Sequence, residues 1–96
     1  MNDIMDKLEK QKEMHIRRWF VVAKNLAQTR GQGWYITFEE FFDLWNEDDR
    51  WLDRGRGSSD LCLSRRDMTM DWYPQNVEII TRRKMLQREN KLRWDR

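Results

Sequence analysis

The chain has 96 residues, with 19 Lys and Arg against 17 Asp and Glu, and it holds one His and one Cys. This length accommodates one domain, and no apolar run approaches the ~20 residues that a membrane-spanning helix needs. The lone Cys62 excludes a disulfide framework or a cysteine zinc site, and the lone His15 excludes metal sites built on several histidines. We therefore expect a single cytoplasmic domain over residues 1–96, without association with membranes.

The charges are distributed unevenly along the chain. Residues 1–53 carry 8 basic and 11 acidic groups, whereas residues 54–96 carry 11 basic and 6 acidic groups. Most of the basic groups in the second half are arginines, whose planar guanidinium suits phosphate. This half is therefore a candidate phosphate-binding surface, with a solvated helix face as the alternative. The acidic residues of the first half are candidates for contact with a basic protein.

Two helices are predicted in the first half. Apolar residues recur at helical spacing between residues 4 and 27, and Gly31 is placed to end this helix in the left-handed conformation. We expect its most polar part, residues 1–12, to fray or to project from the domain. Thr37 and Glu40 have the spacing of a capping box at the start of a second, shorter helix. Its apolar stripe consists of Phe38, Phe41, Phe42 and Trp45.

Two strands and a helix are predicted in the second half. Residues 61–65 alternate between apolar and polar side chains, and residues 76–81 form the second candidate strand. A last helix is expected over residues 82–94, with Met85, Leu86, Leu92 and Trp94 as its apolar elements. The predicted order is α-α-β-β-α, which is an α+β fold.

Several short motifs occur in a fixed order along the chain. The first strand ends in Leu-Ser-Arg-Arg-Asp at residues 63–67, and Trp-Tyr-Pro-Gln-Asn-Val follows at residues 72–77. Upstream lie Arg-Gly at 30–31, Ile-Thr-Phe-Glu-Glu-Phe at 36–41 and Arg-Gly-Arg-Gly at 54–57. Over about residues 16–90, this set resembles the ββα-metal core of HNH endonucleases, in the branch of small phage proteins. The resemblance implies N-terminal helices packed on a ββα core that contains Trp19, Trp34, Trp45 and Trp72.

The resemblance also implies where catalytic groups would stand. An HNH site uses a metal ligand and a His base from the first strand, an Asn that orients the base, and a ligand from the helix, around one Mg²⁺-type ion. Here these positions fall on Ser64, Arg65, Asn76 and Met85. Arg65 accepts no proton at neutral pH, and the Met85 thioether is a poor ligand for a hard cation. We therefore expect neither catalysis nor a cofactor.

Two carboxylates and one imidazole remain as candidates for other chemistry. Asp67 and Asp71 follow the first strand and are weak metal-ligand candidates, with turn capping as the alternative. Asn76 has a similar alternative, in which its amide ties the loop to the backbone. His15 lies on the first predicted helix, outside the motif.

The first functional hypothesis is a non-catalytic HNH-like phage protein that binds nucleic acid, DNA rather than RNA, in the host cytoplasm. Arg65 would then hold a phosphate where the base normally stands. The candidate nucleic-acid-binding residues are Arg54, Arg56, Arg65, Arg66, Arg82, Arg83 and Lys84.

Two alternatives stay open. In one, the protein is a phage accessory protein that binds and inhibits or redirects a host protein, such as a defence nuclease or a polymerase, through Glu47, Asp48 and Asp49. In the other, it is a nuclease with a displaced Mg²⁺ site on Asp67 and Asp71.

Overall fold

The computed structural model describes residues 3–94, so the two residues at each end of the predicted domain lie outside the described part. The helices are α1 (Asp3–Thr29), α2 (Phe38–Asn46) and α3 (Arg82–Trp94), and the strands are β1 (Leu61–Arg65) and β2 (Val77–Thr81). Short 3₁₀ segments span Glu47–Asp53 and Pro74–Asn76. The predicted α-α-β-β-α order is confirmed.

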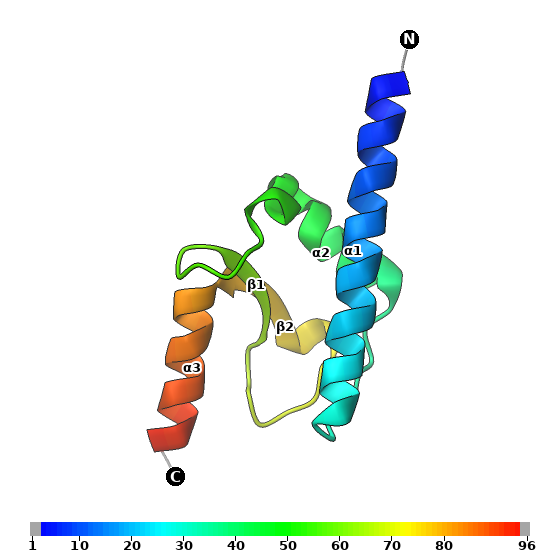
Figure 1. Ribbon diagram of the computed structural model, residues 1–96. Coiled ribbons are helices and arrows are strands. Elements are labelled where there is room, and N and C mark those ends of the chain that lie inside the picture. The colour runs from blue at the N-terminus through cyan, green and yellow to red at the C-terminus, as the bar shows by residue number, and fades with distance from the viewer. Residues whose placement is uncertain (1–2, 95–96) are drawn as a thin grey trace.

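The core lies between α1, α2 and one face of the β-hairpin (Figure 1). Its buried residues are Ile16, Ile36, Phe41, Trp45 and Val77, and the partly buried Trp19, Trp34 and Trp72 pack against them. Phe20 contacts Trp34, Phe38 and Phe41 edge-on, at ring-centroid distances of 5.4–5.8 Å. The tryptophan load therefore serves mainly to build a core in a small domain.

The hairpin presents two different faces. β1 and β2 pair antiparallel, with Leu63 opposite Ile79 and Ser64 opposite Glu78. Because side chains alternate along a strand, Leu63 and Ile79 face the core, whereas Ser64 and Glu78 face α3. Figure 1 shows α1 and α3 on either side of this hairpin.

Helix α1 extends past the body of the domain. Residues 3–11 are all exposed, and packing begins at Lys12, which is 8% exposed and donates from Nζ to Asn46 Oδ1 at 2.8 Å. The N-terminal turns project freely in Figure 1. At the other end, Gly31 has φ +73° and the Gln32 amide donates to the Ala27 carbonyl, so the predicted glycine termination is confirmed.

The capping box of α2 yields a first prediction. Thr37 Oγ1 accepts from the Glu40 amide at 3.2 Å, and Glu40 Oε1 accepts from the Thr37 amide at 2.9 Å. Thr37→Ala leaves the Glu40 amide without its acceptor, and we expect it to lower the free energy of unfolding by about 1 kcal/mol. Thermal unfolding should shift down by roughly 4–8 °C. Thr37→Ser keeps the oxygen and should shift less; equal shifts for both variants would contradict the capping role.

Two parts of the fold differ from the expectation. Glu47–Asp53 forms a 3₁₀ segment in which Asp48 and Asp49 have φ of 53° and 54°, a conformation that sequence periodicity does not reveal. Helix α3 contains no buried residue, and its predicted apolar elements Leu86 and Trp94 are 45% and 83% exposed. The helix itself is confirmed, but its apolar elements form no buried stripe, because the sheet face under α3 is partly polar.

Candidate nucleic-acid interface

Four basic residues lie where the 54–60 loop contacts the start of α3, and a fifth, Lys84, follows them in the first turn of that helix. The Arg82 amide donates to the Asp60 carbonyl at 2.8 Å, and the Arg83 amide donates to the Ser58 carbonyl at 2.9 Å. The Arg82 guanidinium also donates to the Gly55 carbonyl, at 3.2 and 3.3 Å. These bonds fasten the loop to the helix, and the resulting basic cluster consists of Arg54, Arg56, Arg82, Arg83 and Lys84.

The cluster concentrates positive charge. None of its five side chains forms an ion pair with a carboxylate in the described part of the chain. Burial lowers the pKa of Arg54, and the nearby charge of Arg82 lowers it further. Arg54 also lies over the Trp19 ring, 4.4 Å from its centroid, which fixes its direction. Arg54, Arg82 and Arg83 are thus held in place by neutral partners, and their charges are available to an anion.

Helix α3 begins with a sequence that its own dipole disfavours. The N-terminal end of a helix carries a partial positive charge, which favours acidic side chains by about 0.3–1 kcal/mol each. The first turn of α3 has no acidic residue and instead consists of Arg82, Arg83 and Lys84. Its amides are satisfied locally, because Thr81 Oγ1 accepts from the Lys84 amide at 3.2 Å. No acidic residue of this turn compensates the positive charge, and Lys84 lies close enough to Glu78 for its charge to help lower the pKa of that carboxyl.

The two other candidate arginines lie elsewhere. Arg65 is half-buried, with its guanidinium 5.1 Å from the Trp72 ring centroid and Nη1 donating to the Met70 carbonyl at 2.8 Å. Burial is the main cause that lowers the pKa of Arg65. Arg66 pairs with Glu78 at 3.0 Å. The structure does not place either of them in the basic cluster.

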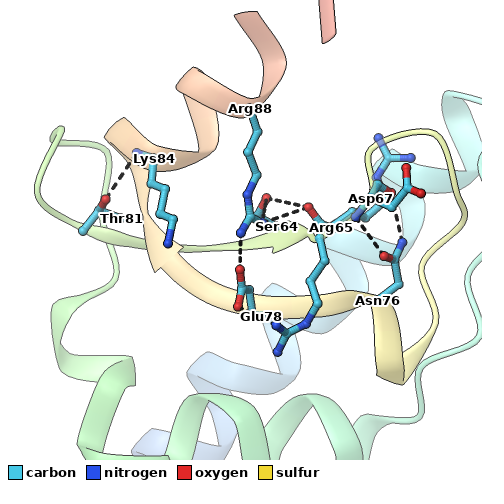
Figure 2. A network of polar contacts seen from close by, with 9 residues as sticks. Ser64, Arg65, Asp67, Asn76, Glu78, Thr81, Lys84 and Arg88 are labelled. Atoms are coloured by element: carbon cyan, nitrogen blue, oxygen red, sulfur yellow. Dashed lines mark hydrogen bonds and ion pairs between the residues drawn. The ribbon is translucent and has the colours of Figure 1, made fainter. Parts of the chain in front are cut away.

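The four HNH-like positions do not form one site. Ser64 and Arg65 are successive strand residues and point to opposite faces of the hairpin, as Figure 2 shows. The Asn76 amide group binds the loop, because Nδ2 donates to the carbonyls of Asp67 and Asp71 and Oδ1 accepts from the Asp67 amide. Met85 and Cys62 both line a groove between α1 and α3.

Ser64 instead contacts the ion pair between Arg88 and Glu78, which was not predicted from the sequence. Arg88 Nη1 donates to Ser64 Oγ at 3.3 Å and to the Arg65 carbonyl at 2.9 Å, while Nη2 bonds Glu78 (Figure 2). The Arg88 bond is the largest cause that holds the pKa of Glu78 below its ordinary value. The sequence does contain a signal for this ion pair. Glu78 alternates with the apolar Val77 and Ile79 along the strand, so its carboxylate lies on the opposite face of the hairpin, under the last helix.

The Glu78 pair predicts a pH dependence. Because the pKa of Glu78 is lower in the folded state, its ion pair stabilises the fold above pH 4.5 and this contribution is lost as pH falls through the folded-state pKa. We expect Glu78→Gln to be less stable than the parent chain at pH 7. The difference, measured by urea unfolding, should shrink steadily as the pH is lowered below 4.5. A difference that is constant over this range would contradict the pairing.

Asp67 and Asp71, the candidate ligands of a displaced Mg²⁺ site, already accept hydrogen bonds within the chain. Asp67 Oδ1 accepts from the amide and hydroxyl of Thr69 at 2.9 and 2.6 Å, and these bonds lower the pKa of Asp67. Asp71 Oδ1 accepts from the Gly33 amide at 3.0 Å. Within residues 3–94, no three His, Cys, Asp or Glu side chains group as metal ligands. His15 stacks near Trp19 and Trp51, away from these residues.

The acidic candidates lie on a separate surface. Glu47, Asp48 and Asp49 are exposed at the start of the 3₁₀ segment, and Glu47 pairs with Arg50 at 3.5 Å. This segment follows α2 and leads into the 54–60 loop (Figure 1).

Comparison with protein-family models, curated proteins and solved structures finds no match to this chain. In the part of the chain that the structure describes, none of the helices has the length and apolar character needed to cross a membrane.

Proposed function

We propose that this protein binds DNA, without cleaving it, through the basic cluster on an HNH-like scaffold. The observation that carries the proposal is the start of α3, where three cations stand at the positive end of a helix with no acidic neighbour in the turn. Such an arrangement costs stability in the free protein. A phosphate backbone would remove that cost, because it supplies the missing negative charges.

The surroundings of the HNH-like positions support binding rather than hydrolysis. Arg65 at the base position is a permanent cation whose Nη1 is bonded to the Met70 carbonyl. Ser64, at the position of the first metal ligand, is 2% exposed and contacts the Arg88 guanidinium of α3. A cation at that place repels a metal ion, so these residues favour a structural role.

The salt dependence of binding tests the proposal. Three to five phosphate contacts give a drop in affinity of about 10²-fold between 50 and 200 mM salt. We would measure fluorescence anisotropy with labelled single-stranded and duplex DNA of matched sequence, then incubate both with Mg²⁺. Salt-sensitive binding with intact DNA is the expected result. Absence of binding at 50 mM salt would overturn the proposal, and Mg²⁺-dependent cleavage would overturn its non-catalytic part.

One observation favours a second candidate function, which is binding of a basic partner protein. Asp48 and Asp49 are exposed successive residues with positive φ, a backbone strain that persists mainly where the surroundings or a function requires it. Asp48→Lys with Asp49→Lys should abolish such binding in high salt while leaving DNA binding intact. If this variant still binds a host protein with unchanged affinity, the acidic surface is not the binding site for that protein.

A further inference from the structure

A groove runs along α1 on the side that faces α3. It has a volume of about 400 Å³, and its apolar walls include Val22 and Leu26 of α1 and Leu86 of α3. These three side chains are 48%, 48% and 45% exposed. A row of half-exposed aliphatic side chains along a groove is typical of a surface that another chain covers.

The projecting end of the same helix carries a matching apolar edge. Ile4 and Leu8 are 75% and 50% exposed and belong to the exposed residues 3–11 that precede the first packed residue of α1. At 3.6 residues per turn, one face of α1 holds residues 4, 8, 11, 15, 19, 22 and 26. The intervals between them are 4, 3, 4, 4, 3 and 4 residues, so the positions are arranged symmetrically about residue 15.

This symmetry has a geometric consequence. When two copies of α1 lie antiparallel around a two-fold axis at residue 15, position 4 of one copy meets position 26 of the other, and position 8 meets position 22. The exposed Ile4 and Leu8 of each copy then cover Leu26 and Val22 of its partner. Such an interface is isologous and closed, as two-fold symmetry requires. The helices overlap over about 33 Å, from residue 4 to residue 26.

The charges on the two surfaces are complementary. The projecting residues 3–11 carry Asp3, Asp6 and Glu9 against Lys7 and Lys10, a net charge of −1. The charged residues that line the groove are Arg30, Arg54 and Arg82 against Glu89, a net charge of +2. In the antiparallel pairing, Asp3 comes level with residue 27 of the partner, one turn from its Arg30. We infer that this groove binds the projecting N-terminal turns of α1 from a second copy of the same chain, so that the protein is a two-fold symmetric antiparallel dimer.

This inference does not rest on DNA binding, and sedimentation of the full chain without DNA tests it. We expect about twice the chain mass of 12.0 kDa at 200 µM protein. Ile4→Glu, on the part of α1 that contacts nothing else in the domain, should weaken dimerisation on the order of tenfold or more. Val21→Glu is the matched control, because Val21 is 50% exposed on α1 but lies outside the row. A monomer at 200 µM would overturn the inference.

Engineered cysteines test the register separately. The Ile4→Cys and Leu26→Cys double variant should form a disulfide-linked dimer on mild oxidation. Neither single variant should, because each residue lies about 33 Å from its own copy in the partner. Cross-linking of Ile4→Cys alone would indicate parallel helices and would contradict the antiparallel groove. A dimer in which the double variant does not cross-link would contradict it equally.

Discussion

Replacing Trp45 with alanine is expected to lower the free energy of unfolding by about 3–5 kcal/mol. Trp45 is 1% exposed and contacts Trp19 and Phe41, at ring-centroid distances of 5.6 and 6.4 Å. Its removal leaves a cavity at the junction of α1 and α2, where a thin core has few neighbours that can collapse into the space. Since a domain of this size has about 5–15 kcal/mol of stability in total, the variant should be partly unfolded near 37 °C.

Trp45→Phe separates packing from hydrogen bonding at the same position. Trp45 Nε1 is buried and has no acceptor among the described residues, so the phenylalanine variant loses ring volume but no hydrogen bond. We expect it to be clearly less destabilised than Trp45→Ala in urea unfolding followed by circular dichroism. An alanine variant within about 1 kcal/mol of the parent chain would contradict the assignment of Trp45 to the centre of the core.

Reversal of two charges in the basic cluster is expected to change stability and DNA binding in opposite directions. Arg83→Glu with Lys84→Glu places acidic side chains in the first turn of α3, which should stabilise the helix by about 0.3–1 kcal/mol for each residue. The same change removes two phosphate-binding cations. We expect the affinity for DNA at 50 mM salt to fall at least about tenfold, and the slope of log affinity against log salt to decrease by about 2.

A matched variant distinguishes a local site from general attraction. Lys91→Glu with Arg93→Glu makes the same change in net charge in the last turn of the same helix. If the basic cluster is the site, this control should retain most of the affinity. Equal losses in the two double variants would show that binding depends on net charge alone.

Local signals in the sequence were sufficient to predict the three helices and the two strands. The Thr37 and Glu40 spacing predicts the start of α2, Gly31 predicts the end of α1, and alternation predicts both strands within one residue. These features depend on bonds between residues near one another in the chain. The 3₁₀ segment after α2 was missed because its turn rests on two aspartates in the left-handed region, which carry no glycine as a marker.

The candidate site was less predictable because it depends on contacts between distant segments. Charge alone grouped Arg65 and Arg66 with the basic cluster, but the strand directs Arg65 towards Trp72, and Glu78 pairs with Arg66. The role of Arg88 depends on where α3 crosses the hairpin, which no local pattern specifies. In contrast, the loop at residues 54–60 and the start of α3 were both identified as basic, and the structure brings them together.

Mapping bound DNA on the amide resonances of the protein tests the central claim most directly. The structure predicts that a short duplex, titrated at 50 mM salt, shifts the amides of residues 54–60 and 81–86. Glu47–Asp53, on the acidic surface, should stay unchanged. Shifts confined to the acidic segment, or none at DNA concentrations in the hundreds of micromolar, would contradict the assignment of the basic cluster as a nucleic-acid-binding site.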